Sequence, residues 1–319
     1  QIPEPPPSLT ATVRRVIRPM VDGDVPAAAA LLVRRHATHR DVSPLLAPLD
    51  QATAEVEVRA LLDKDDAAGW VAEDAGAVVG YLLAVSHQPQ WFGPNAYVHA
   101  AGWAGAHLED LYAEAAAQWH AAGRLGHYVM APASQVEPWF HLGFGVQHVH
   151  AAMPAVPRPA DPRVRPVRPE DLPALPAVDL ALDEVLQASP VFSRISHGTY
   201  DELLQGWVEA LDTYEVQVAE LDGVVVGALV AGEVGPDSSN AGIVKPEGAG
   251  FFAFAAVLQQ ARGVGLGRAL GDAAISWAAR TGHPSVCTDW RSANLGAARS
   301  WPSLGYEPTF FRLHRQLAG

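Results

Sequence analysis

The sequence predicts a mixed α/β protein that consists of two tandem copies of one domain, and three observations support this. Segments of the first half recur in the second half, in the same order and roughly 150 residues later. Each repeated segment alternates between strand-like apolar runs and helix-like stretches. A length of 319 residues with 49% hydrophobic and 18% charged residues suits two globular domains.

The repeated segments predict the same elements in each half. Both halves begin with a short strand, a polar turn whose Asp can cap a helix, and that helix. A hairpin follows, with two apolar runs around a glycine-containing turn. A Trp-x-x-Leu-Gly-aromatic motif lies near the end of each half. The matching segments are 16–26 with 164–173, 70–81 with 217–228, and 139–144 with 301–306.

The two copies are predicted to meet in a proline-rich linker. Residues 153–163 contain Pro154, Pro157, Pro159 and Pro162 and show no apolar periodicity, which is typical of a stiff connection. We therefore expect the first domain to end at residue 153. The predicted domains are residues 1–153 and residues 154–319.

The most informative segment, residues 257–270, leads from an apolar run through three alternating glycines to a helix-like stretch. Gly263, Gly265 and Gly267 leave consecutive backbone N–H groups uncovered, so these groups can turn toward one ligand. The N-terminus of the helix expected over residues 269–279 adds a partial positive charge. Such a loop is suited to a diphosphate.

The side chains and the spacing of this loop narrow the choice of ligand. Arg262 and Arg268 can donate hydrogen bonds to phosphate oxygens. The loop lacks the Gly-Lys-Ser/Thr ending of a nucleotide-triphosphate loop. It also departs from the Gly-x-Gly-x-x-Gly dinucleotide pattern, although Asp289 lies near the distance at which that pattern has its acidic residue. A tight strand-to-helix turn without a ligand is the structural alternative.

Two signatures in the second half resemble those of the GCN5-related N-acetyltransferases (GNATs). The first is similar to the acyl-CoA signature of that family, and the second to its downstream signature. They occur in the family's order, with a strand expected between them over residues 285–290. The resemblance is clear in the second half and weaker in the first half. The signatures read Arg262-x-x-Gly265-x-Gly267 and Asn294-x-x-Ala297-x-x-x-Trp301-x-x-x-Gly305-Tyr306.

This resemblance implies a fold and a co-substrate. Each copy would be a mixed, mainly antiparallel sheet flanked by helices, with two strands splayed apart to admit pantetheine. The second copy would bind acetyl-CoA or another acyl-CoA, and a backbone N–H of Val257 or Leu258 would hold the thioester oxygen. No metal is implied. The residues expected to bind the co-substrate are Val257, Leu258, Arg262, Gly263, Val264, Gly265, Leu266, Gly267, Arg268 and Asn294.

Three side chains are candidates for catalysis. Asp289 ends a strand near the expected reacting centre and could be a general base, although it could instead pair with Arg291 or cap the next helix. Glu233, which also ends a strand, is the second candidate base. Trp301 stands where the family usually has a tyrosine acid. An indole cannot give up its proton at neutral pH, so Trp301 could contact pantetheine or pack in the core.

Histidines and cysteine give no further site. His148 and His150 alternate along a strand, and His36 and His39 lie one helical turn apart. Because no Cys or carboxylate completes a tetrahedral set around them, we expect surface or packing histidines and no metal. The single cysteine, Cys287, is expected to pack in the core.

The first copy is predicted to lack the co-substrate. Alignment on the Leu-Gly-aromatic motif places Ala100, Trp103 and Gly105 opposite the three signature positions of the second copy. Trp103 would put an indole where the backbone must approach a diphosphate closely. We therefore expect a scaffold, a lid or half of an acceptor pocket, unless gaps in the alignment conceal a working loop.

The predicted function is transfer of an acyl group from CoA to a primary amine of a small molecule. Residues 183–207 are the expected acceptor wall. An aminoacyl-tRNA or a carrier-protein thioester is the alternative donor, and the net charge of −13 disfavours tRNA and general nucleic-acid binding. A non-catalytic acyl-CoA sensor is the alternative from another class.

The expected setting of the protein follows from what the sequence lacks. No apolar run is long enough for a membrane helix, and residues 1–8 show no secretion pattern. We therefore expect a cytoplasmic monomer or homodimer with no membrane partner.

Overall fold

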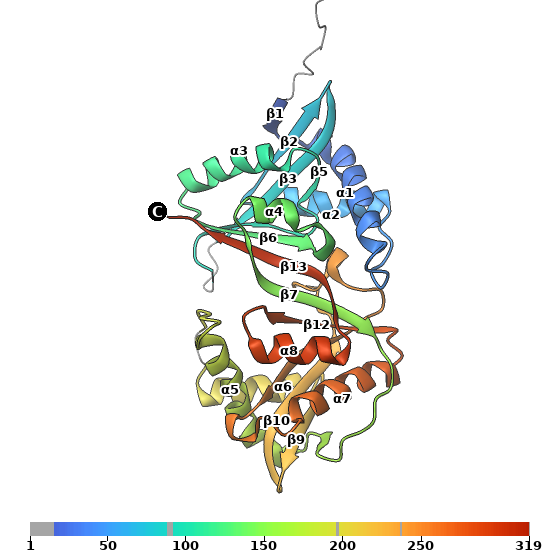
Figure 1. Cartoon of the computed structure of the whole chain (residues 1–319), viewed down its shortest axis with the longest axis vertical. Helices are drawn as coiled ribbons and strands as arrows, with labels where there is room; N and C mark the ends of the chain where they lie inside the picture. The colour runs from blue at the N-terminus through green and yellow to red at the C-terminus, as the bar shows by residue number, and fades with distance from the viewer. Residues whose placement is uncertain (1–15, 88–91, 196–197, 237, 319) are drawn as a thin grey trace, which may run out of the picture.

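The computed structural model describes residues 16–87, 92–195, 198–236 and 238–318 (Figure 1). Its two halves repeat one order of elements, and the predicted hairpins are present as β2–β3 and β9–β10. The first half contains β1 (Val16–Pro19), α1 (Val25–Arg40), α2 (Gln51–Leu62), β2 (Ala67–Asp74), β3 (Ala77–His87), β4 (Asn95–Val98), β5 (Trp103–Gly105), α3 (Leu108–Ala121), β6 (Gly126–Pro132), α4 (Glu137–His141) and β7 (Gly145–Pro154).

The second half follows the same plan with a longer connection before its third helix. It contains β8 (Val164–Pro166), α5 (Leu175–Gln187), α6 (Tyr200–Ala210), β9 (Glu215–Leu221), β10 (Val224–Glu233), β11 (Gly250–Val257), α7 (Leu266–Arg280), β12 (Ser285–Arg291), α8 (Leu295–Leu304) and β13 (Glu307–Gln316). Helix α7 begins at Leu266, earlier than the sequence predicted, and β7 includes Pro154, so the extended linker starts at residue 155.

The strands join into one sheet that runs through both halves. In the described residues, thirteen strands form the order β1-β2-β3-β4-β6-β13-β7-β12-β11-β10-β9-β8, with β5 paired to β3. Two pairs are parallel, β4 with β6 and β11 with β12. The other pairs are antiparallel, and helices flank the sheet (Figure 1). The predicted mixed, mainly antiparallel architecture is confirmed.

The two halves exchange their last strands. β13 lies between β6 and β7, and its Phe310 pairs with Pro132 on one side and His150 on the other (Figure 1). β7 in turn pairs with β12, where Cys287 lies opposite Ala152. Each half therefore completes the sheet of the other, an arrangement that the sequence analysis did not anticipate.

The internal repeat extends to side-chain contacts. In both halves, an arginine of the first strand bridges an aspartate beside the first helix and a glutamate of the hairpin, with N–O distances of 2.6–2.7 Å. Each aspartate also accepts a hydrogen bond from the backbone N–H three residues before it, as the third residue of a capping box does, and neither caps the following α-helix with its side chain as the sequence predicted. The two triads are Arg18–Asp24–Glu73 and Arg165–Asp171–Glu220.

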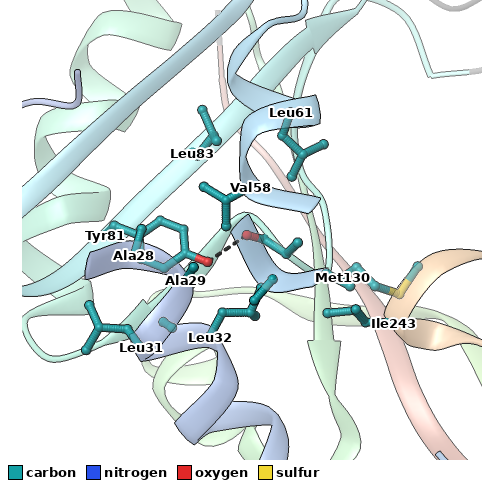
Figure 2. Close-up of a cluster of buried hydrophobic side chains, with 14 of the residues drawn as sticks. Ala28, Ala29, Leu31, Leu32, Val58, Leu61, Tyr81, Leu83, Met130 and Ile243 are labelled. Carbon is teal, nitrogen blue, oxygen red and sulfur yellow. Dashed lines mark hydrogen bonds between the residues drawn. The ribbon is translucent and has the colours of Figure 1, made fainter. Parts of the chain in front are cut away.

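The core of the first half includes a segment of the second. Helices α1 and α2 pack on the sheet face that carries Tyr81, Leu83 and Met130 (Figure 2). The Tyr81 hydroxyl donates to the carbonyl oxygen of Ala101 at 2.7 Å. Ile243, from the connection between β10 and β11, joins the same cluster (Figure 2). The halves therefore share an apolar core as well as a sheet.

Helices cover both faces of the second half's sheet. Leu270 of α7 and Trp301 of α8 pack with Phe252 on one face. Val178 of α5 and Trp207 of α6 pack on the other. Cys287 is buried as predicted, and burial raises the pKa of its thiol to about 12. Residues 1–8, which were inspected for a secretion pattern, lie outside the described residues, and no helix of the described part is long and apolar enough to cross a membrane.

Candidate acyl-CoA site

Two parallel strands of the second half separate and open a cleft. β11 and β12 pair over three residues that end at Phe252 and Thr288. β11 nevertheless stays paired with β10 as far as Val257. Ala253 adds one residue to β11 that β10 does not match, which is a β-bulge. The backbone edge of β11 beyond the bulge is therefore open toward the cleft, as the resemblance implied.

The glycine loop lies between β11 and α7, at the open end of this cleft. Gly263 and Gly265 have φ angles of 86° and 87°, in the left-handed region that favours glycine. Gly265 is the N-cap of α7 and supplies no side-chain cap. A Cβ atom at Gly263 or Gly267 would meet no atom within 4 Å, so the loop borders open space.

The loop and the first turn of α7 present unpaired N–H groups. The first helical bond runs from Ala269 N to Gly265 O. The N–H groups of Leu266, Gly267 and Arg268 precede it and find no acceptor in the described part of the chain. N–H groups at a helix N-terminus, with its partial positive charge, are suited to phosphate. The described loop thus presents unpaired N–H groups as the sequence predicted, and their contact with a diphosphate stays a prediction.

Two arginines hold the loop in place. Arg262 Nε donates to the Val257 carbonyl at 2.9 Å, and its Nη2 donates to the Ala181 carbonyl at 3.3 Å. Arg163 Nη1 donates to the Val264 carbonyl at 3.0 Å. These contacts tie the loop to the end of β11, to α5 and to the linker. The predicted ligand arginine, Arg262, therefore also shapes the loop.

A cleft of about 250 Å³ runs from the loop along the splayed strands. Its walls come from α5, the end of β11 and α8. The predicted co-substrate residues that line it are Val257, Arg262, Gly267 and Asn294. Arg268 is exposed at the start of α7, 3.6 Å from Asp272, and can extend toward a bound phosphate.

The two predicted oxyanion donors differ in their bonding. Leu258 N donates to the Val226 carbonyl of β10 at 2.8 Å, so its N–H is already used inside the sheet. Successive N–H groups of a strand point to opposite edges. The N–H of Val257 therefore points away from β10, toward the opening between β11 and β12. Of the two, Val257 has the geometry for an oxyanion contact.

Asn294 and Trp301 form the far wall of the cleft. Asn294 is the N-cap of α8, and its Oδ1 accepts from Ala297 N at 3.3 Å. Trp301 is buried in α8, and its ring meets Phe252 edge-to-face with centroids 5.1 Å apart. Trp301 thus lines the cleft and packs in the core at once.

Asp289 is the first residue of β12 beyond the last pair with β11. Its Oδ1 accepts from His148 Nε2 at 2.5 Å, and its Oδ2 accepts from the Asn240 amide. Arg312 Nη2 donates to His148 Nδ1 at 3.0 Å. Asn240 Oδ1 accepts from His150 Nδ1 at 2.9 Å. Asp289 therefore anchors a polar network that joins β7, β12 and β13.

The charge states in this network follow from its hydrogen bonds. Because Arg312 can only donate, His148 Nδ1 must carry a lone pair, and the imidazole is neutral with its proton on Nε2. Burial lowers the pKa of His148 to about 4, although Asp289 opposes this shift. Burial acts to raise the pKa of Asp289, but His148, His150 and Asn240 hold it well below its usual range. Asp289 is thus a carboxylate that stays ionised.

Glu233 lies apart from this network. Its side chain is 70% exposed and faces His283 Nε2 at 3.4 Å and Lys245 Nζ at 3.7 Å. It pairs with Gly250, at the start of β11, where β11 and β12 are still joined. The structure therefore brings Asp289 and Trp301 to the splayed strands and leaves Glu233 at the opposite end of the paired segment.

The first half fills the equivalent cleft with its own side chains. Trp103 pairs with Leu82 of β3, as Ala255 pairs with Leu229 of β10. Since the two leucines are equivalent in the repeat, Trp103 corresponds to Ala255. The Trp103 ring packs edge-to-face on Trp139, with centroids 5.3 Å apart.

This register corrects the alignment made from the sequence, which placed Trp103 opposite Gly265. Only residues 106–107 join β5 to α3, whereas residues 258–265 join β11 to α7. An alignment that counts residues back from the Leu-Gly-aromatic motif does not detect that this loop is shorter in the first half. The first half thus has no counterpart of the glycine loop in its described residues.

A buried arginine also occupies the first half's splayed region. Arg35 of α1 donates to the carbonyls of Trp103 and Ala100, both at 2.5 Å. Its guanidinium lies 4.6 Å from the centre of the Trp103 ring. These contacts use backbone groups and space that a co-substrate would need.

Several site residues were missed or misread in the sequence. His148 and His150 were interpreted as surface or packing residues, but both lie in the buried Asp289 network. Asn240 and Arg312 reach that network from a loop and from the exchanged strand β13. The strand exchange brings these residues together, and nothing in the local sequence signals it.

The second half resembles a known protein family. Residues 181–306 match the model of the Acetyltransferase (GNAT) family. The matched range contains the glycine loop, the splayed strands and α8. No curated protein sequence matches the chain. The second half is therefore similar to the GNAT N-acetyltransferases, and the whole chain shares the fold of a solved GNAT structure.

Solved structures show the same fold over nearly the whole chain. A GCN5-related N-acetyltransferase from Sphaerobacter thermophilus is similar with a TM-score of 0.61 and 15% identity, over 96% of each chain. The glucosamine N-acetyltransferase region of a fungal GH3 β-N-acetylglucosaminidase gives 0.56 and 14%, over 96% of this chain and 38% of that one.

Proposed function

We propose that residues 154–319 transfer an acyl group from acetyl-CoA or another acyl-CoA to a primary amine of a small molecule. The observation that carries this proposal is the continuity of the glycine loop with the 250 Å³ cleft along β11. The loop offers unpaired N–H groups for a diphosphate, and the cleft leads from them to the splayed strands. In this proposal residues 1–153 form a scaffold that holds no co-substrate.

Each end of the cleft has a distinct role in the proposal. The N–H groups at the start of α7, together with Arg268, hold the diphosphate, and Arg262 keeps the loop in shape. The open edge of β11 and Trp301 flank pantetheine. When bound, acyl-CoA supplies the thioester that the amine attacks. The N–H of Val257 would stabilise the negative charge that develops on the thioester oxygen.

Asp289 is the proposed contact for the amine. A carboxylate whose pKa lies well below the usual range is a weak base at neutral pH. We therefore propose that Asp289 attracts the amine and stabilises the positive charge that develops on its nitrogen, while the proton leaves to water. Glu233, exposed and ion-paired, is the alternative proton acceptor.

Calorimetry with acetyl-CoA, followed by assay of CoA thiol release with a panel of primary amines, tests the proposal. We expect acetyl-CoA to bind and one class of amine to release the thiol. Gly267→Trp, whose side chain would enter the open space beside the loop, should abolish binding without unfolding the protein. Gly23→Trp, at an equally open position of the first half, is the control and should bind normally.

Three outcomes would contradict the proposal. Binding without thiol release from any amine would favour an acyl-CoA sensor. Absence of binding would point to another donor. Unchanged affinity in Gly267→Trp would show that the loop does not hold the diphosphate.

A further inference from the structure

A second cleft lies beside the proposed acyl-CoA site, between the two halves. It holds about 650 Å³ and receives residues from the first half, such as Tyr128 and Gln147. Residues 190–194, from the connection between α5 and α6, form another wall. Residues 291–293 line it too, and the next residue, Asn294, lines the acyl-CoA cleft. The two clefts therefore lie near each other just after the end of β12.

The described lining of this second cleft is cationic. It includes Arg194 and Arg291 and no aspartate or glutamate, while burial and the nearby arginines lower the pKa of His314 so that this histidine is neutral. The charge of this lining is opposite in sign to that of the whole protein, which has a net charge of −13. A locally positive cleft in an acidic protein attracts an anionic ligand and repels a cationic one. The cleft is thus suited to an acceptor that carries a negative charge.

Arg291 has no carboxylate partner in the described part of the protein. No Asp or Glu oxygen lies within 4.0 Å of its guanidinium there. Its described neighbour is the ring of Phe92, whose centre is 5.8 Å from Arg291 Cζ. Burial and the nearby Arg312 lower the pKa of Arg291 to about 10. Removing a cation from water without an anion is costly, and a bound anion would offset that cost.

Arg312, which is buried, adds a positive charge near the half-buried Arg291. Its Nε donates to Gln147 Oε1 at 2.8 Å, and its Nη2 donates to His148 Nδ1, so these partners are neutral. Its Cζ lies 5.1 Å from the centre of the Phe92 ring. Asp289, already bound to His148 and Asn240, is a carboxylate that interacts with Arg291. Arg312 itself lines a neighbouring cleft that also contains Glu57, so the cations in the described lining of the second cleft are Arg194 and Arg291.

We infer that Arg291 binds a carboxylate or phosphate group on the acceptor, so that the substrate is an amine that also carries an anion. This inference rests on the proposed acyl transfer in the second half. It assigns the acceptor to the cleft between the halves and gives the first half a role in holding it. Arg194 lines the same cleft and contributes a second positive charge.

The register of β12 sets the distance between the two ends of the acceptor. Asp289 and Arg291 are two residues apart on one strand, so their side chains leave the same face with Cα atoms about 7 Å apart. The amine at Asp289 and the anion at Arg291 are therefore only a few bonds from each other. Short amino acids and amino phosphates fit this spacing.

Matched amines that differ only in the anion test the inference. Phosphoethanolamine is compared with ethanolamine, and γ-aminobutyrate with γ-aminobutyramide, at saturating acetyl-CoA. We expect kcat/KM to be about 10- to 100-fold higher for the anionic member of at least one pair, because charge-assisted hydrogen bonds stabilise the complex. A preference within the phosphoethanolamine pair would indicate a phosphate group on the acceptor, and a preference within the γ-aminobutyrate pair would indicate a carboxylate.

Variants assign the preference to Arg291. Arg291→Gln should remove it, mainly by raising the KM of the anionic amine, and Arg291→Lys should retain part of it. The affinity for acetyl-CoA should not change in either. Arg59→Gln is the control for charge, since Arg59 lies on α2 and contacts Asp22 at 3.5 Å. Thermal denaturation of each variant verifies that it is folded.

The outcomes separate this inference from the proposed function. Equal turnover of both members of every pair, or a preference that survives in Arg291→Gln, would overturn the inference and leave acyl transfer intact. If no amine is turned over, calorimetry with phosphoethanolamine and γ-aminobutyrate decides. Binding that is lost in Arg291→Gln supports the anion site while the proposed transfer fails, and absence of binding overturns both.

Discussion

Replacing Ala255 by Trp should close the acyl-CoA cleft by the device that already closes it in the first half. Ala255 lines the cleft, and its counterpart Trp103 is buried against Trp139. The counterpart of Trp139 is Trp301, which lines the same cleft as Ala255. An indole at position 255 therefore has an aromatic surface to pack on and an open space to fill.

The expected loss of affinity follows from the surface that the new indole would bury. A Trp side chain that buries about 150 Å² at about 25 cal/mol per Å² gains about 4 kcal/mol. A ligand that must displace it loses that amount, which corresponds to a roughly 1,000-fold weaker Kd. The folded state should be unaffected or stabilised, because the substitution fills a cleft and leaves the core of the second half intact.

Isothermal titration calorimetry with acetyl-CoA measures the effect, and thermal denaturation verifies the fold. Ala52→Trp, on the exposed surface of α2, is the matched control and should bind as the parent protein does. A Kd within threefold of the parent value for a cooperatively folded Ala255→Trp protein would refute the assignment of this cleft. It would also contradict the inference that Trp103 fills the equivalent cleft of the first half.

Three further predictions test the glycine loop, the Asp289 network and one buried histidine, His127. Gly267→Ala should raise the free energy of unfolding by about 0.5–1 kcal/mol, because the new Cβ meets open space near the start of α7; a lower value in urea titrations would contradict this. Asp289→Asn should lower kcat at least 10-fold, and if Asp289 acts electrostatically the pH of half-maximal rate should stay that of the amine, whereas a general base would shift it. Burial lowers the pKa of His127 to about 4. Because the unfolded chain binds a proton near pH 6.5 and the folded protein does not, stability is present above pH 6.5 and falls by about 3 kcal/mol as the pH approaches 4. In His127→Leu the difference in unfolding free energy between pH 7 and pH 4.5 should shrink by about 2 kcal/mol, and an unchanged difference would exclude this role.

The second half was the more predictable part of the site because its chemistry is local. The positive φ angles at Gly263 and Gly265 require glycine, so the sequence records the shape of the loop directly. Those glycines placed the helix after the loop, although α7 begins three residues earlier than the expected residue 269. The repeated apolar runs likewise predicted the two hairpins, β2–β3 and β9–β10.

The buried network was not predictable because its members are distant in sequence. His148 and Asp289 lie 141 positions apart, and Arg312 joins them from the last strand. Their meeting depends on the insertion of β13 between β6 and β7, which leaves no periodic signal. The shortened loop of the first half was missed for a related reason, since an alignment without the sheet register cannot locate a deletion.

The exchange of β7 and β13 has a consequence for how the protein is assembled. β6 and β7 are synthesised first, yet they come to lie on either side of a strand that the ribosome makes more than 150 residues later. The centre of the sheet can therefore form only after β13 emerges, and neither half cut out at the linker would keep all its strand partners. Gain or loss of one copy of the domain would disrupt the sheet of the other copy. The evolution of the first half, whose described residues lack the glycine loop, is therefore coupled to that of the second half.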